Sequence, residues 1–411
     1  MVRYLARDPQ WRIATGHKGE IMRLPESIIQ ASILHPEEEI RLAAVAFFSG
    51  SHSSSETVMP RVVRAVERYG RNKAFRILRS AERLRQTAAT VDWLLGELRR
   101  DYAADERDED NYRYAIALVL FRAEPELLQP RRGEIAALPM FPAPLRAAFD
   151  ERLEWFRRDW EQGCAALEAL AGQSLRKGRL TASDARRADC IVESLARHAA
   201  TKAATALDLL RRSQQAGCAA WLRWCRPWIM SLAGAMRLDA AVPLAVTSLC
   251  DDDLNVADES TTALVKIGND AVVRAIAACW PSADAGFRAA ASDVLEHIHS
   301  GLCGETALKF FTAEEDRETK LCLAHAVLSQ FLSDGVEPVR QLVLAEGAEV
   351  PPNGLDIRRR LVASCAVMGV SFPEFAAWYA EAVADNWGLG NYRPHRVADD
   401  LPPHRPEPKR S

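Results

Sequence analysis

The feature that most constrains the fold of this chain is a set of glycines that recur about every 34 residues in its second half. Gly268, Gly301, Gly335 and Gly369 are spaced by 33, 34 and 34 residues, and each closes an apolar segment with helical periodicity. Glycine suits the end of a helix because the chain often turns there through a left-handed conformation. A period in the thirties built from two helices is typical of an array of stacked helix pairs.

An acidic turn lies upstream of each of the first three glycines. The turns contain Asp253, Asp284 and Asp316, which stand 31 and 32 residues apart. A carboxylate placed just before a helix can accept hydrogen bonds from the first amides and suits the positive end of the helix. Each unit is therefore predicted to read helix, acidic turn, helix, short glycine turn.

The helix that follows the acidic turn carries a second repeated sequence. Residues 287–291 (FRAAA) and 40–44 (IRLAA) fit a Val-Arg-x-x-Ala type of start, residues 357–361 and 319–320 are weaker copies, and residues 256–257 lack the arginine. This start resembles that of HEAT-like repeats, over about residues 236–370 and more loosely over 20–100. The resemblance implies an all-α chain, folded as a HEAT-like α-solenoid or superhelix with an irregular helical middle.

Helical periodicity also dominates outside the repeats, and strand patterns are scarce. The clearest single helix runs from about Ala182 to Gln214, where Thr181 and Asp184 form a capping box. We divide the chain into an N-terminal helical unit with HEAT-like features (1–104), a long-helix middle segment (105–235), HEAT-like repeats (236–385) and a Pro-rich flexible tail (386–411). The five prolines of the tail forbid a continuing helix.

Cysteine usage and hydropathy bear on the compartment. The nine cysteines include no C-x-x-C pair, and most lie singly among apolar residues, which is typical of reduced, buried thiols. The chain starts without the apolar segment of a secretory signal, and no apolar run approaches the roughly 20 residues that span a bilayer. We therefore expect a cytoplasmic protein that does not contact membranes.

A basic ridge is the most function-like feature of the sequence. Residues 61–90 hold nine Lys or Arg against two Glu, a local charge of +7 in a chain whose net charge is −3. The spacing of three and four residues places these arginines along helix faces, with Val62, Val66 and Tyr69 on the buried side. We predict a partner-binding surface made of Arg61, Arg64, Arg68, Arg71, Arg76, Arg79 and Arg83. The alternative is a solvated face whose arginine stems cover apolar neighbours.

Two further patches have both a functional and a structural interpretation. Residues 238–335 hold 16 Asp or Glu and 6 Lys or Arg, a net charge of −10, which would suit a basic partner or would simply cap helices. Trp221, Trp224 and Trp228 share one helix face flanked by arginines, a composition found at interfaces. Because Pro227 marks a helix boundary, we favour a seal between helical sub-bundles for the tryptophans.

No constellation of residues indicates catalysis. The sequence contains no H-E-x-x-H, G-x-S-x-G or phosphate-loop motif, and His297 and His299 diverge on a helix, so no catalytic residue, metal ligand or cofactor is predicted. The expected role is a non-catalytic protein-interaction scaffold or regulatory adaptor that binds another protein. Nucleic-acid binding through the 61–90 ridge is one alternative. An enzyme of HEAT-like lyase or glycosylase type, with its site in a groove, is the other.

Overall fold

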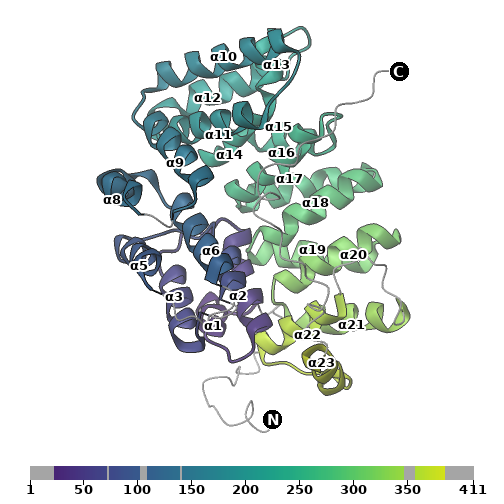
Figure 1. The fold of residues 1–411 in the computed structure, drawn as a ribbon. Helices are drawn as coiled ribbons and strands as arrows, with labels where there is room; N and C mark the ends of the chain where they lie inside the picture. Colours follow the sequence, from purple (N-terminus) through teal and green to yellow (C-terminus); the bar gives the residue numbers. More distant parts are fainter. Residues whose placement is uncertain (1–22, 72–73, 102–108, 139–140, 347–356, 385–411) are drawn as a thin grey trace, which may run out of the picture.

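The computed structural model describes residues 23–71, 74–101, 109–138, 141–346 and 357–384, and these residues are almost entirely helical (Figure 1). Within these ranges there is no β-strand, and the only extended pairing is a single bridge between Arg23 and Leu332. The all-α fold class expected from the sequence is therefore confirmed. None of the described helices is long and apolar enough to cross a bilayer. The Pro-rich tail predicted at 386–411 lies outside the described residues.

The first part of the chain folds into short and medium helices. They are α1 Glu26–Ser32, α2 Glu38–Gly50, α3 Val58–Tyr69, α4 Phe75–Ser80, α5 Ala88–Arg99, α6 Glu109–Arg122, α7 Pro125–Leu128, α8 Arg132–Ala136, α9 Ala143–Phe156, α10 Trp160–Lys177, α11 Ala182–Ala196, α12 Ala199–Ser213 and α13 Ala220–Trp224.

The second part continues as regular pairs. Its helices are α14 Arg226–Ala235, α15 Val242–Thr247, α16 Leu254–Ile267, α17 Asp270–Cys279, α18 Ala285–His297, α19 Gly301–Ala313, α20 Arg317–Ser329, α21 Ser333–Glu346, α22 Ile357–Met368 and α23 Phe375–Ala384. Short 3₁₀ turns lie at Gln129–Arg131, Asp239–Ala241, Ser248–Cys250 and Trp280–Ser282.

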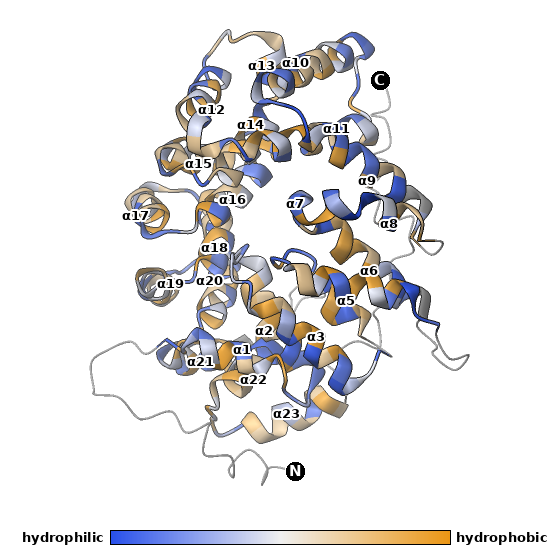
Figure 2. Ribbon diagram, turned by 90° about the vertical axis from the view of Figure 1, so that its left-hand side faces the viewer, coloured by the Kyte–Doolittle hydropathy of each residue, from blue (hydrophilic) through white to orange (hydrophobic). Residues whose placement is uncertain are grey.

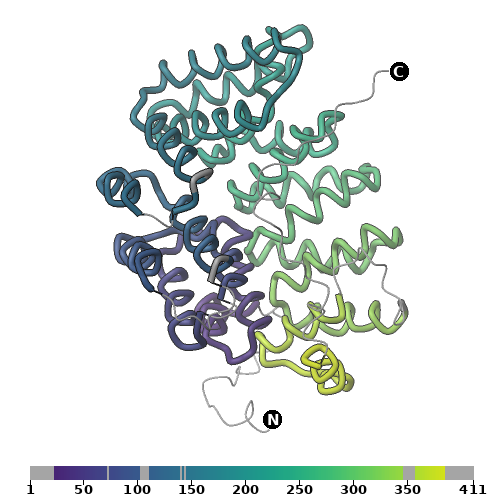
Figure 3. Tube along the Cα trace, viewed as in Figure 1, coloured from purple at the N-terminus to yellow at the C-terminus, as the bar shows by residue number. Residues whose placement is uncertain are grey.

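Alternate helices pack side by side and close into a ring. The packing runs from α2 through α4, α6, α9, α11, α14, α16, α18 and α20 to α22, and α22 packs back against α2. The partner helices α17, α19 and α21 lie outside this inner layer, as the ribbon turned by 90° shows (Figure 2), and the tube follows the same course of the chain (Figure 3). The two parts of the chain that are farthest apart in sequence are therefore neighbours, and the array has no free end at α2 or α22.

The closure is fixed by specific contacts of the segment before α1. The Leu24 amide donates a 3.3 Å hydrogen bond to the Phe331 carbonyl, and the Arg23 guanidinium donates one of 2.6 Å to the His299 carbonyl. The Arg23 guanidinium also lies over the Phe47 ring. Buried apolar side chains from Leu24 to Met368 form one continuous core, so this closure is part of the main hydrophobic structure.

The predicted repeat unit is present between α16 and α21. The inner helices α16, α18 and α20 begin at residues 254, 285 and 317, and each is followed by its outer partner. The predicted acidic caps are confirmed, because the carboxylates of Asp253, Asp284 and Asp316 accept hydrogen bonds of 2.8–3.0 Å from first-turn amides of α16, α18 and α20. Each period of the sequence therefore corresponds to one pair of helices, an inner helix and the outer helix that follows it.

The glycines occupy two different positions in this unit, which corrects the expectation that each one closes a helix. Gly268 and Gly369 do follow the last residue of α16 and α22, with φ of 60° and 67°. Gly301 is the first residue of α19, and Gly335 lies in the first turn of α21. At Gly335 an added Cβ would lie 2.3 Å from Val327 Cγ1, so that glycine permits close packing onto α20.

The long helix expected over 182–214 is wrong in one respect, because the structure contains two helices there. The capping box of Thr181 and Asp184 is confirmed at the start of α11. The helix is interrupted at Arg197 and His198, and α12 begins at Ala199. No glycine or proline marks this break. The two helices pack differently, α11 between α9 and α14, and α12 against α14 and α13, so tertiary packing decides it.

Candidate functional site

The exposed part of the predicted basic ridge is the outer face of α3. Val62 and Val66 are buried, whereas Arg64 and Arg68 are exposed and Arg61 is half-buried, as the three-and-four spacing predicts. Arg61 and Arg64 have no hydrogen-bond or ion-pair partner among the described residues. These two guanidiniums are therefore available to an anionic group, and their use as a partner site stays a prediction.

Arg71 departs from the ridge, and its expected place on the solvent-facing side of the helix is wrong. The helix ends at Tyr69, and Gly70 turns the chain with φ of 90°. The Arg71 guanidinium then makes two 2.6 Å hydrogen bonds to the carboxylate of Glu97, which is buried. Burial raises the pKa of Glu97, but Arg71 and Tyr112 outweigh burial and hold it below its ordinary value.

The other ridge arginines do not join the exposed face of α3. Arg76 pairs with Glu38 and Glu39 of α2 at 3.3 and 2.6 Å. Arg79 is half-buried on α4 and also has a partner. Arg83 is exposed, yet its charge acts on Lys266 of α16, which places it on the inner side of the ring. The arginines of residues 61–90 thus do not form one surface.

Many of the acids of 238–335 have structural partners. Besides the three caps, Asp251 pairs with Arg226 and the buried Glu314 pairs with Arg288 at 3.2 Å. Glu314 also accepts hydrogen bonds from the amides of its own turn. These contacts support the interpretation of the acidic array as helix caps and inter-repeat links, and its use as a partner surface stays a prediction.

The tryptophan cluster lies at a junction between helices. Trp224 and Trp228 stack with ring centroids 4.7 Å apart, across the boundary between α13 and α14. Trp221 and both of these rings are half-buried against the core, and the Trp228 indole N–H donates a 3.0 Å hydrogen bond to Asp189 of α11. Pro227 lies in the first turn of α14. This arrangement supports the seal between sub-bundles that the sequence favours.

All nine cysteines are free thiols, as the sequence predicts. Three are buried, five are half-buried and Cys250 is exposed. Burial raises the pKa of Cys225 and Cys365 to about 12, and that of Cys164 to about 11. Because the thiolate is the reactive form, these cysteines behave as small apolar side chains.

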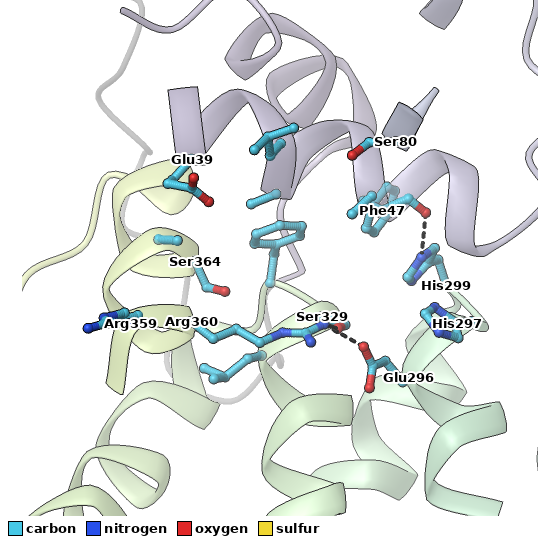
Figure 4. Close-up of a pocket in the computed structure, with 16 residues that line it drawn as sticks. Glu39, Phe47, Ser80, Glu296, His297, His299, Ser329, Arg359, Arg360 and Ser364 are labelled. Atoms are coloured by element: carbon cyan, nitrogen blue, oxygen red, sulfur yellow. Dashed lines mark hydrogen bonds and ion pairs between the residues drawn. The ribbon is translucent and has the colours of Figure 1, made fainter. Parts of the chain in front are cut away.

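A cavity of about 500 Å³ lies where the ring closes, and we call it the closure pocket (Figure 4). Its apolar side chains come from α2 and from α20 and the residues after it, and they include Leu42, Ala46, Phe47, Leu328 and Phe331. Its polar side chains come from five helices and from the turn after α18, and they include Glu39, Ser80, Glu296, His297, His299, Ser329, Arg359, Arg360 and Ser364. The pocket therefore exists only because both ends of the array meet.

Arg360 organises the polar wall of the pocket. Its guanidinium donates a 2.5 Å hydrogen bond to Glu296 Oε1, binds the Ser329 hydroxyl, and approaches His325 Nδ1 at 3.2 Å. Burial raises the pKa of Glu296, but Arg360, with the two histidines nearby, outweighs burial and leaves the pKa low. Burial and then Arg360 lower the pKa of His325 to about 4, so this imidazole is neutral at pH 7.

His299 joins the two sides of the closure. Its ring stacks on Phe47 with centroids 3.7 Å apart, and its Nε2 lies 2.9 Å from the Phe47 carbonyl, which can only accept (Figure 4). Burial, followed by the charge of Arg23, lowers the pKa of His299 to about 3. The ring is therefore a neutral donor that holds α2 against the turn after α18.

Three side chains of α18 beside this wall have the chemistry of metal ligands. Asp293, Glu296 and His297 each place one candidate ligand atom within 4.8 Å of the other two. Asp293 is exposed, and the other two are half-buried. The sequence contains this group as carboxylates and an imidazole at i, i+3 and i+4, and the expectation of no metal ligand stays a prediction.

The rest of the pocket could not be found from the sequence. Its walls combine residues 39–47 with residues 296–364, and nothing in the sequence shows that these segments touch. The sequence indicates residues 357–361 only as a weak copy of the helix-start motif, although Arg360 in this segment is central to the site. The one usable signal was the spacing of acids and histidine in α18.

The chain matches no protein-family model, and it matches no curated protein. The likeness to HEAT-like repeats therefore depends on the short helix-start motifs and the order of helix pairs alone.

Proposed function

We propose that the protein binds a small organic molecule in the closure pocket. The observation that carries this proposal is a cavity of about 500 Å³ with apolar and polar walls built from both ends of the chain. Ligand pockets are commonly about 300–1,000 Å³, mostly apolar, with a few convergent polar groups that fix orientation. The proposal follows the groove-site alternative in location but assigns no reaction.

The wall chemistry limits the kind of ligand. Glu39 is paired with Arg76, and Glu296 is paired with Arg360, so the wall has little uncompensated charge. The hydroxyls of Ser80 and Ser364 add neutral hydrogen-bonding groups. A ligand with an apolar body and one hydrogen-bonding head group fits these walls, whereas a highly charged ligand would break an existing ion pair.

The test uses N-phenyl-1-naphthylamine, a neutral apolar dye whose fluorescence rises on leaving water. We expect saturable binding of one dye per chain. Ala46 is exposed on α2 and lines the pocket, so Ala46→Trp should fill the cavity and weaken dye binding at least about tenfold, or about 1.4 kcal/mol. Ala278→Trp, on the exposed side of α17, is the matched control. Dye binding by Ala46→Trp that equals the wild type would refute the proposal.

A second candidate function is an interaction scaffold that contacts an anionic protein partner through α3. It is favoured by the free guanidiniums of Arg61 and Arg64 next to the exposed Arg68. None of the nine cysteines forms a disulfide, which supports a cytoplasmic place for this role. On this proposal the helix pairs are HEAT-like repeats that present α3 on the outside of the ring.

Exchanging Arg64 and Arg68 for Glu tests the scaffold. Both side chains are exposed, so each change should alter folding stability by under about 0.5 kcal/mol. Binding of a polyglutamate peptide should fall sharply in the double variant and fade as salt rises. Equal binding by wild type and double variant counts against the scaffold. Tight, strongly salt-dependent binding of duplex DNA would instead favour the nucleic-acid alternative.

A further inference from the structure

Three side chains on the inner face of α18 meet, and only Glu296 among them bonds to another described residue, Arg360. Asp293, Glu296 and His297 bring their candidate ligand atoms within 4.8 Å of one another. Neither Asp293 nor His297 makes a hydrogen bond or ion pair with another described residue. The carboxylates of Asp293 and Glu296 repel each other, although Arg360 compensates part of the charge of Glu296, and a cation bound by both would remove the remaining repulsion.

The raised pKa of Asp293 agrees with a carboxylate whose solvation is reduced and that lies close to other negative charges. The side chain is reachable by water, but it lies on the inner side of the ring, where the surrounding protein reduces its solvation. That burial raises the pKa of Asp293, His297 opposes the rise, and the charges of Glu296 and Asp258 add to it. An added positive charge at this place would oppose the rise in the pKa of Asp293.

Each of the other two side chains is held from outside α18. Arg360 on α22 donates to Glu296 Oε1 and orients the carboxylate as outer-sphere groups do around metals. The His297 ring lies against Gly50 at the end of α2, where an added Cβ would be 2.6 Å from Nδ1. Three helices of the closure therefore fix the group.

We propose that Asp293, Glu296 and His297 bind a divalent transition metal ion, with Zn²⁺ as the ion that fits best. An imidazole and two carboxylates suit Zn²⁺ better than Mg²⁺ or Ca²⁺, which prefer oxygen ligands alone. In a tetrahedral site with bonds of about 2.0–2.2 Å, ligand atoms are roughly 3.5 Å apart, so modest side-chain rotations complete the geometry.

The position of the group leaves room for a further ligand. Glu296 and His297 line the closure pocket, and Asp293 does not. Three protein ligands leave at least one coordination position of Zn²⁺ open, as in catalytic zinc sites. That position adjoins a cavity of about 500 Å³, so an oxygen atom of a pocket ligand could complete the coordination. The metal site does not depend on the pocket taking an organic ligand.

The experiment titrates Zn²⁺ into the chelator-stripped full chain by calorimetry. We expect one ion per chain. Asp293→Asn is isosteric at an exposed position, so it should leave thermal unfolding of the metal-free protein unchanged. Because Asp293 is a direct ligand in this proposal, its loss should weaken Zn²⁺ binding at least about 100-fold, the largest loss of affinity typical of removing an outer-sphere partner. Glu305→Gln, on the exposed side of α19, should bind like the wild type.

Co²⁺ absorption identifies the ligands, because thiolate ligands add a sulfur-to-cobalt charge-transfer band. Cys322 on α20 is close enough for Asp293 to raise its pKa, so Cys322→Ser is the matched test of sulfur ligation. We expect no such band and unchanged affinity. The proposal is overturned if no saturable binding is found, if Asp293→Asn binds like the wild type, or if the band appears.

Dye and metal measurements separate this inference from the proposed function. Asp293→Asn should lose Zn²⁺ and keep the naphthylamine dye, whereas Ala46→Trp should lose the dye and keep Zn²⁺. Loss of dye binding alone affects only the pocket proposal. Absence of Zn²⁺ binding in the wild type, with dye binding intact, overturns only the metal site.

Discussion

At the scale of the single residue, the imidazole of His35 takes the place of a helix cap. Its Nδ1 accepts a 3.0 Å hydrogen bond from the Glu37 amide, just before α2 begins. Burial, and then the nearby Arg41, lower the pKa of His35 from 6.5 to about 4. The folded protein therefore needs a neutral ring here, whereas the unfolded chain protonates it near pH 6.5.

This difference predicts an acid-sensitive contribution to stability. The contribution of His35 is complete above pH 6.5 and is lost as the pH falls toward about 4, because the unfolded chain takes up the proton first. His35→Asn keeps an acceptor near the same place and cannot titrate, so its free energy of unfolding should fall less over this pH range. Urea denaturation at several pH values measures the difference.

The control is His35→Ala, which removes the acceptor and should be less stable by about 1 kcal/mol above pH 6.5. A wild-type pH dependence in His35→Asn would show that the ring does not titrate as described.

Residue-scale features were predictable where the partner is near in sequence. The caps at Asp253, Asp284 and Asp316 bond to amides two or three residues away, so spacing alone identifies them. Arg71 failed as a prediction because its partner, Glu97, is 26 residues away on another helix.

At the scale of the helix, α14 and α16 approach each other closely at Gly234. An added Cβ at Gly234 would lie 2.4 Å from the Ala263 Cα, which is backbone and cannot move alone. Gly234→Ala should therefore push these helices apart and cost about 1–3 kcal/mol of stability. Thermal unfolding followed by circular dichroism gives the measurement.

Gly96→Ala provides the matched comparison. Gly96 lies inside α5, and an added Cβ there meets nothing within 4 Å. Alanine should then stabilise the helix by up to about 1 kcal/mol. If Gly234→Ala also raised the melting temperature, the close contact between α14 and α16 would be incorrect.

The existence of helices was easier to predict than their ends. The period of helix pairs from α16 to α21 follows from repeated acids and glycines. The break between α11 and α12 has no such marker, because an alanine-rich sequence suits one long helix as well as two. Gly301 and Gly335 were predicted to close helices because the spacing between glycines does not show whether a glycine begins or ends a helix.

At the scale of the whole molecule, the contact of α22 with α2 predicts coupling between distant parts of the sequence. Leu361 is fully buried in α22, and Leu361→Ala should cost about 2–5 kcal/mol. Hydrogen exchange should then speed up in α2 as well as in α20 and α22, because α22 packs against both α2 and α20.

Leu170→Ala is the control, since Leu170 is buried in α10, which packs on α11 and α13. It should speed exchange in those helices and affect α2 less than Leu361→Ala does. Unchanged protection of α2 in Leu361→Ala would mean that the closure contributes little.

The closure itself could not be predicted from the sequence. Each helix pair follows from local pattern, but the small rotation between successive pairs decides whether an array spirals open or returns to its start. That rotation depends on side-chain packing at every interface, such as the close approach of Gly234 to Ala263. The closure pocket forms only where the array closes, so it could not be predicted from the sequence either.

The return of α22 to α2 changes how this array can move. An open array of helix pairs can bend gradually, because small rotations at each interface add up to a displacement of its free ends. Here a rotation at one interface must be cancelled by opposite rotations at others, or the α2–α22 contact must break. The array therefore has two states, a rigid closed ring and an open array in which the α2–α22 contact is broken. Because the closure pocket lies at this contact, opening would remove the pocket in a single step.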